Sequence, residues 1–158
     1  MDEVGGYAER GWPEDYDLLL RVWRSGGRLA AVDRMLLQWR IHRDRISVRH
    51  DSYTPEAFRR CKVHYLLDTL ARDRGGLVVW GAGPIGKAFA LEVQRQGGTV
   101  RAFVELNPRK INQSIHGAPV IPPSEIDERR DGFSVAAVGQ EGARARIRAT
   151  LESAGWKE

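Results

Sequence analysis

Apolar residues follow two different patterns along the chain, and the pattern changes near residue 72. Before that point, apolar side chains recur at helical spacing over residues 13–23 and 55–70, and a proline opens each stretch. Residues 29–32 and 36–41 lie between these predicted helices and have the character of short extended segments.

After residue 72, short apolar runs alternate with amphipathic stretches. The predicted strands are residues 77–80, 99–104, 119–121 and 133–138, and the predicted helices are 84–96, a stretch opened by Pro122-Pro123-Ser124, and 142–154. This alternation predicts a parallel sheet with right-handed crossovers. The sequence therefore predicts an α/β fold in two parts, residues 1–71 and 72–158, divided at the polar stretch 71–76.

The first part offers too little structure for an independent core. It has two helices, a few short extended segments and many apolar side chains, so we expect its apolar face to find partners outside this chain. Cys61 lies on the apolar face of the second helix. No positioned base accompanies it, so we interpret it as a core residue rather than a nucleophile.

Composition and charge exclude several classes of protein. Hydrophobic residues make up 42% and charged residues 29%, the net charge is +4, and charges of both signs are interleaved throughout. We therefore expect no nucleic-acid partner. A single cysteine excludes an internal disulfide, no apolar run is long enough for a transmembrane segment, and the acidic start is unlike a secretory signal. These features predict a cytoplasmic protein.

The segment Gly81–Gly86 reads G-x-G-x-x-G between a predicted strand and a predicted helix, which is the setting that a nucleotide-binding turn requires. Gly81 would allow the tight turn, Gly83 would let the backbone approach a pyrophosphate, and Gly86 would let helix and strand pack closely. Glu105 ends the next strand, where an acid could accept hydrogen bonds from ribose hydroxyls. The alternative is a packing turn in a Rossmann-like domain that binds no ligand.

The nature of the ligand stays open at this point. Arg109 and Lys110 follow Glu105 and could favour a phosphorylated ribose, so NAD and NADP are both candidates. Residues 77–139 resemble the small Rossmann-like domains found beside bacterial sugar-modifying enzymes. The resemblance rests on the glycine turn, on Phe-Val-Glu-x-Asn-Pro-x-Lys and on Gly-Ala-Pro-Val-Ile, and it adds a nucleotide-sugar as a candidate ligand.

The first part contains an acidic turn with flanking motifs. In order, these are Gly5-Gly6-Tyr7, Glu14-Asp15, Asp17-Leu18, Arg21, the stretch 36–42 and Ser47. Together they resemble the C-terminal half of the catalytic domain of family 2 glycosyltransferases, which have the GT-A type of fold. That resemblance predicts an incomplete GT-A-type segment ahead of the Rossmann-like domain.

This resemblance implies inverting transfer of a sugar from a nucleotide-diphosphate-sugar to a saccharide acceptor. Asp15 would be the catalytic base and Glu14 its neighbour in the acceptor site, while His42 would lie near a divalent metal, Mg or Mn, that supports the leaving diphosphate. The structural alternatives are that acids at a helix start favour the helix dipole and that a lone histidine in a basic loop is solvated.

The family's nucleotide-binding half and its Asp-x-Asp metal motif do not precede Glu14. We therefore expect a truncated bacterial glycosyltransferase fragment that is inactive alone and needs a missing N-terminal half or a second chain. A second hypothesis is a regulatory or assembly module that binds a nucleotide or nucleotide-sugar without catalysis. A third is an NAD(P)-dependent oxidoreductase, which only the glycine turn supports.

Overall fold

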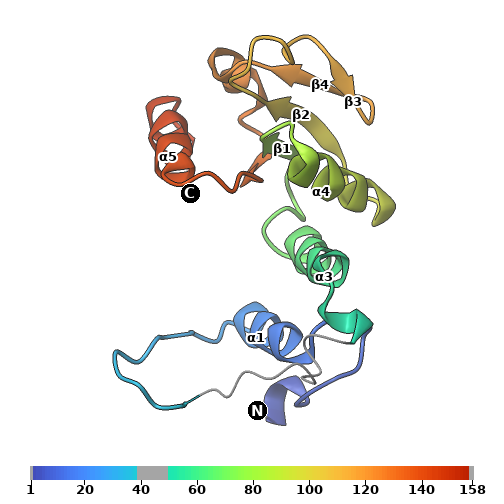
Figure 1. Ribbon diagram of the computed structural model, residues 1–158, viewed down its shortest axis with the longest axis vertical. Coiled ribbons are helices and arrows are strands. Elements are labelled where there is room, and N and C mark those ends of the chain that lie inside the picture. Colours follow the sequence, from blue (N-terminus) through green and yellow to red (C-terminus); the bar gives the residue numbers. More distant parts are fainter. Residues whose placement is uncertain (1, 39–49, 157–158) are drawn as a thin grey trace. The chain divides into compact units, whose positions relative to one another are not determined.

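The computed structural model describes residues 2–38 and 50–156. Its internal contacts divide the chain into two compact units, Met1–Tyr65 and Leu66–Glu158 (Figure 1). The division falls within a helix, slightly before the polar stretch at which the sequence suggests a boundary. The two units are described separately.

The described part of unit 1 contains two α-helices, α1 (Glu14–Arg24) and α3 (Pro55–Asp68), and two short 3-10 helices, η1 (Asp2–Val4) and η2 (Asp51–Tyr53). Helix α1 starts directly after a proline, with three acidic residues in its first turn and two arginines in its last turn. Both groups of charges interact favourably with the helix dipole and stabilise the helix, which forms where the sequence predicts it.

Residues 25–38 form no strand, so the extended segment predicted at 29–32 does not become part of a sheet. The segment predicted at 36–41 lies partly outside the described residues. A short strand needs neighbouring strands to pair its backbone groups, and the described part of unit 1 supplies none. The exposed apolar side chains of this stretch are Leu29, Val32, Met35, Leu36 and Leu37.

Unit 2 is an α/β domain with a mixed five-stranded sheet. Its elements are β1 (Leu77–Trp80), α4 (Pro84–Arg95), β2 (Val100–Val104), β3 (Ser114–Ile115), β4 (Ala118–Ile121), η3 (Pro123–Arg129), β5 (Phe133–Ala136) and α5 (Ala143–Ser153). The strand order is β3-β4-β2-β1-β5, and only the β3–β4 pair is antiparallel. The prediction of a Rossmann-like sheet is confirmed, although the sequence missed β3 and suggested a helix where the 3-10 helix η3 lies.

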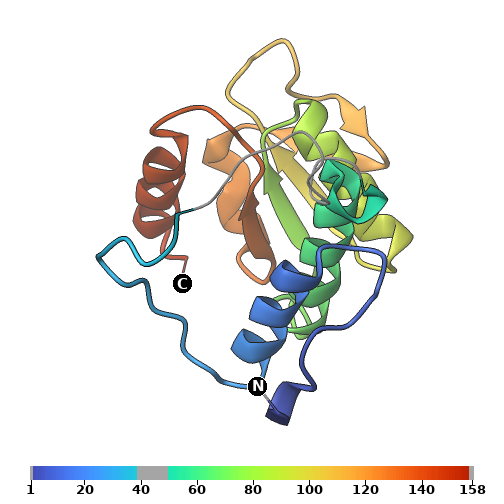
Figure 2. The ribbon, with the colours of Figure 1, turned by 60° about the horizontal axis from the view of Figure 1, so that its bottom comes forward.

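Helices α4 and α5 cover opposite faces of this sheet (Figure 2). Val78 and Trp80 of β1 face a buried cluster against which Ile147 of α5 packs. The other face of β1 carries Val79, which lies next to Gly86 of α4. All four residues of β1 are buried, as expected for a central strand covered on both sides.

Within residues 2–38 and 50–156, every helix is too short or too polar to cross a bilayer.

Candidate functional site

The strand order of unit 2 identifies where a ligand could bind. Across the sheet, the parallel strands lie in the order β4-β2-β1-β5. Along the chain these are the third, second, first and fourth parallel strands, so the direction of winding reverses between β1 and β5. Ligands of such sheets bind in the crevice at the carboxyl ends of the strands, where this reversal falls. Here the glycine turn follows β1, and residues 137–140 follow β5.

Two of the three glycines in the turn are required by packing within the chain. Gly81 has a left-handed φ of +101°, and a methyl group there would lie 2.7 Å from Val138 Cγ1. A methyl group on Gly86 would lie 1.8 Å from the carbonyl oxygen of Gly81, which is a severe clash with backbone. Gly86 therefore lets α4 lie tightly against the turn after β1, and Gly81 lets that turn pass close to the segment after β5.

Gly83 is different, because nothing in the described chain crowds it. Its φ of −87° and ψ of −176° are extended values that any residue can adopt. No atom of the described residues lies within 4 Å of where its side chain would begin. The backbone at Gly83 is therefore open to close approach from outside.

Gly83 also caps the amino end of α4, and this end has the properties of an anion site. Pro84 occupies the first helical position, and the N–H groups of Ile85 and Gly86 have no acceptor within a regular helix. The first turn contains no acidic residue, and Lys87 lies in it. The positive end of the helix dipole adds to this basic character.

Glu105, at the end of β2, lies directly beside the glycine turn. Its Oε2 accepts hydrogen bonds from Ala82 N at 3.2 Å and from Lys110 Nζ at 3.1 Å, and its Oε1 accepts from the N–H groups of Leu106 and Asn107. Partial burial by itself raises the pKa of Glu105, but these four hydrogen bonds outweigh it and lower the pKa. The carboxylate is thus charged and fully occupied, so a ribose hydroxyl would have to displace one of its partners.

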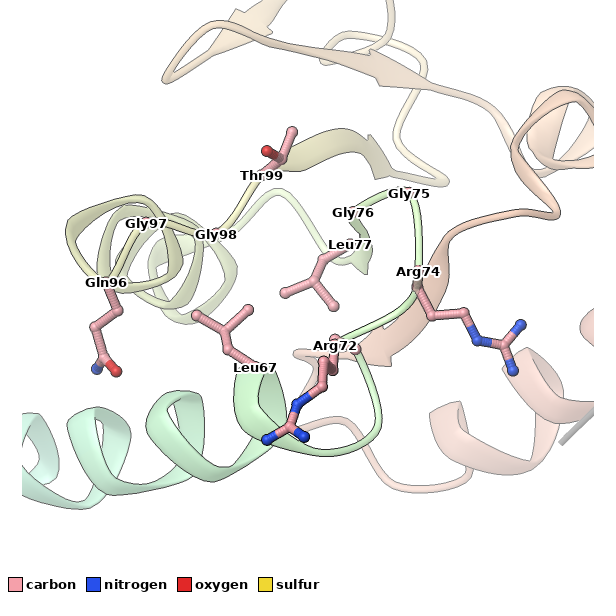
Figure 3. Close-up of a pocket in the computed structure, with 11 residues that line it drawn as sticks. Leu67, Arg72, Arg74, Gly75, Gly76, Leu77, Gln96, Gly97, Gly98 and Thr99 are labelled. Atoms are coloured by element: carbon pink, nitrogen blue, oxygen red, sulfur yellow. The ribbon is translucent and has the colours of Figure 1, made fainter.

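A cavity of about 260 Å³ lies at the opposite edge of the sheet (Figure 3). Its lining comes from the segments that precede β1 and β2, including Gly75, Gly76 and residues 96–99. Because this is the amino edge of the parallel strands, the cavity is separate from the glycine turn and does not belong to the candidate nucleotide site.

The acidic turn of unit 1 places its two predicted catalytic residues in different surroundings. Both oxygens of Glu14 accept hydrogen bonds from the Tyr53 hydroxyl, at 2.7 and 2.8 Å. Burial, reinforced by this hydrogen bond, raises the pKa of Tyr53 to about 12. Asp15 is exposed on the helix surface. No observation tests a catalytic role for either side chain, which stays a prediction.

His42 lies outside the described residues, so its predicted metal role is not tested. Within the described residues, no group of three or more histidine, cysteine, aspartate and glutamate side chains is arranged to hold a metal ion.

Asp17 is a highly connected polar side chain in the described part of unit 1, and the sequence did not single it out as structural. It is fully buried and accepts hydrogen bonds from Trp12 Nε1 at 2.8 Å, from the Tyr65 hydroxyl at 2.7 Å and from Arg21 Nε at 2.7 Å. The spacing of four residues between Asp17 and Arg21 was the one sequence signal for this ion pair.

Cys61 is fully buried, and burial, together with the nearby Asp17 charge, raises the pKa of its thiol to about 12. We expect the native protein not to react with an aromatic disulfide reagent at mildly alkaline pH, because the thiolate is the reactive form. Spectrophotometric thiol titration should detect one thiol after denaturation in guanidinium and none before it. Rapid modification of the native protein would contradict this prediction.

The fold and the glycine turn define unit 2 as a Rossmann-like domain with the features of a phosphate-binding turn. No protein-family model and no curated protein matches the chain. Among solved structures, it is similar to RSP, a Rex-family repressor, at 18% identity and a TM-score of 0.47, over 60% of this chain and 47% of that chain.

Two further matches are complexes of RSP. The complex with beta-NAD+ and operator DNA is 19% identical, with a TM-score of 0.46, over 61% of this chain and 48% of that one. The complex with beta-NADH is 15% identical, with a TM-score of 0.46, over 90% of this chain and 72% of that one. The chain spans about half the length of the first two structures.

These matches are repressors and not glycosyltransferases, which overturns the prediction of a family 2 glycosyltransferase fragment together with its nucleotide-sugar donor and saccharide acceptor. The expectation of no nucleic-acid partner is also overturned, because one matched structure contains operator DNA. Several residues of the motif make structural contacts within unit 1. Asp17 and Arg21 form a buried ion pair, and Glu14 binds Tyr53.

Proposed function

We propose that unit 2 binds a dinucleotide, NAD or NADP, at the turn between β1 and α4, and that it acts as a regulatory module rather than as a catalyst. The observation that carries the proposal is the open backbone at Gly83. Packing accounts for glycine at the first and third positions of the turn, and the approach of a pyrophosphate accounts for glycine at the second.

Helix capping is the competing explanation for Gly83. Glycine is accepted at the capping position, but serine, threonine, asparagine and aspartate are preferred there because their side chains bond to the free N–H groups. Gly83 makes no such side-chain bond. Capping alone would therefore favour asparagine, aspartate or serine over glycine, whereas a bound phosphate would accept from the same N–H groups itself.

Glu105 and Lys110 supply the charges that a dinucleotide would meet next to the turn. A ribose hydroxyl that donates to Glu105 Oε2 would replace the Lys110 ammonium, which binds the same oxygen. The released ammonium would then be free to pair with a phosphate group. This exchange suits NAD and NADP equally, so the affinities must decide between them.

The chemistry available in unit 2 favours binding over catalysis. Residues 66–158 contain no tyrosine and no cysteine, and their single histidine is His116. His116 lies before β4, at the amino edge of the parallel strands and away from Gly81. Histidine, the side chain that most often exchanges protons in catalysis, thus lies far from the turn, and tyrosine and cysteine are lacking from this unit.

A pair of variants at Gly83 tests the proposal. Gly83→Asp and Gly83→Asn both introduce good helix caps of nearly equal size, so neither should lower the stability of unit 2. Both should weaken dinucleotide binding in calorimetric titrations of the full chain. Gly83→Asp should weaken it further, by about tenfold relative to Gly83→Asn, because its charge repels the pyrophosphate.

Calorimetric titrations of the unaltered chain with NAD, NADH, NADP and UDP-glucose complete the test. Binding of NAD or NADP that is lost in Gly83→Asp supports the proposal. Binding of UDP-glucose alone would keep a phosphate site but overturn the dinucleotide. No binding of any of the four, or equal binding by both Gly83 variants and the unaltered chain, would leave the turn a packing device.

A further inference from the structure

A second, larger cavity in unit 2 lies between β5 and α5. Its volume of about 630 Å³ is within the range of roughly 300–1,000 Å³ that small-molecule sites occupy. None of its lining residues belongs to the glycine turn or to residues 105–110. The cavity is therefore distinct from the proposed dinucleotide site, and its role can be tested independently.

The cavity has an apolar lining. Phe133 from β5, Ile147 and Leu151 from α5, and Leu70 and Trp156 contribute to it. β5 is the edge strand of the sheet and pairs only with β1. The residues of β5 are only partly buried, in contrast to the complete burial of β1. Apolar surface is thus available here that the described part of unit 2 does not cover.

The charged side chains of the lining are unbalanced, with four arginines against a single glutamate, Glu152. Arg144 and Arg148 lie one helical turn apart on α5, on the same face as Ile147. Arg130 forms an ion pair with Asp127 at 3.2 Å. Arg144 has no ion pair with any residue in the described part of the chain. An uncompensated cation therefore lies beside an apolar surface.

Trp156 adds an unsatisfied donor to the same lining. Its Nε1 is shielded from water and has no hydrogen-bond acceptor among the described residues. A buried donor without an acceptor costs free energy of about 1–3 kcal/mol. In contrast, Trp80 Nε1 donates to Ser134 Oγ at 2.8 Å. The cavity thus combines an apolar lining with excess positive charge.

We propose that this cavity binds a small amphipathic anion, with an apolar body against Phe133 and Leu151 and a carboxylate or phosphate near Arg144. An apolar body would be removed from water by the exposed lining of β5 and α5. The acidic group would supply a counter-charge for Arg144. Neither a neutral lipid nor a cation would satisfy both features of the lining.

The test uses octanoate as the probe and 1-octanol as its neutral counterpart, each titrated calorimetrically into the full chain. Octanoate should bind at least about tenfold more tightly than octanol, because only octanoate meets the arginines with charge.

Two charge reversals on one helix locate the site. Arg144→Glu should weaken octanoate binding by at least about tenfold, whereas Arg146→Glu, which makes the same change outside the lining, should leave it unchanged. Both residues lie in the first turn of α5, where an acid favours the helix dipole, so both variants should fold. Arg144→Gln provides a milder second variant with the same expected direction.

Three outcomes would overturn the proposal. The first is equal affinity for octanoate and octanol, or no affinity for either in the folded protein. The second is an equal effect of Arg144→Glu and Arg146→Glu, which would indicate a general charge effect. The third is self-association in sedimentation velocity that Arg144→Glu abolishes, which would make a second copy of this chain the occupant of this face.

Discussion

Asp17→Ala is expected to destabilise unit 1 by about 3–5 kcal/mol. The carboxylate of Asp17 is fully buried, and it receives hydrogen bonds from Trp12, Tyr65 and Arg21. Its removal takes away the carboxylate to which Trp12 and Tyr65 donate and leaves the largely buried guanidinium of Arg21 without its counter-charge. Loss of one member of a buried ion pair is among the most damaging single changes.

The damage should extend to the amino-terminal segment. Besides its bond to Asp17, Arg21 donates to the carbonyl oxygen of Val4 and, at 2.5 Å, to that of Gly6. Asp17 therefore positions the side chain that holds this segment in place. Without the carboxylate, Arg21 is expected to turn towards water and release both carbonyl groups.

Hydrogen exchange measured by mass spectrometry tests this prediction, because it reports on peptides of the two units separately. Peptides that cover residues 2–24 should lose protection in Asp17→Ala, while peptides from β1 and β2 should not change. Asp15→Ala is the matched control, since Asp15 is exposed on the same helix and should alter stability by no more than about 0.5 kcal/mol. Equal effects of the two variants would contradict a structural role for Asp17.

The same carboxylate should make unit 1 sensitive to acid. Burial alone raises the pKa of Asp17, but hydrogen bonds from Tyr65, Trp12 and Arg21 outweigh it, and the pKa falls below the ordinary value of 3.8. A lowered pKa stabilises the folded state above the ordinary value, and this stabilisation is lost as the pH falls through the lowered pKa. The stability difference between the unaltered chain and Asp17→Ala should therefore shrink below about pH 4.

The sequence predicted best the elements whose signals are local. Strands β1 and β2 are short apolar runs, and α4 begins with a glycine cap followed by proline, so neighbouring residues suffice to identify them. β3 is only two residues long and exists through its pairing with β4, which no periodic pattern announces. The 3-10 helix η3 begins at the second of two consecutive prolines and has too few residues for a clear helical period.

In the candidate sites, too, the sequence predicts the local features and misses those that depend on tertiary contacts. The position of the glycine turn follows from the local strand–turn–helix order, but the partners of Glu105 depend on the tertiary approach of Ala82. In unit 1, the acids at the start of α1 look equivalent in the sequence. The fold buries Asp17, leaves Asp15 exposed and distinguishes Asp17 through Tyr65, which lies 48 positions further along the chain. Because only the fold makes this distinction, the sequence alone could not separate a buried structural acid from an exposed one.

Gly86→Ala is expected to destabilise unit 2 by about 3 kcal/mol, at the upper end of the cost of overpacking. The added methyl group would lie 1.8 Å from the Gly81 carbonyl oxygen, and backbone cannot yield as a flexible side chain can. Helix α4 would have to move away from β1, which would separate the cap at Gly83 from Glu105. Urea unfolding followed by circular dichroism should show the lower stability, and calorimetry should show loss of any dinucleotide binding.

Gly139→Ala is the control for this effect, because Gly139 has no described atom within 4 Å of its added methyl group and no left-handed φ. It should change the stability of unit 2 by no more than about 0.5 kcal/mol. An unfolding midpoint of Gly86→Ala equal to that of the unaltered chain would contradict close packing of α4 on β1. Gly83→Asn completes the comparison, because it should keep the fold and weaken the binding of dinucleotide. Comparison of the Gly86 and Gly83 variants thus distinguishes the glycine that packing requires from the glycine that ligand approach requires.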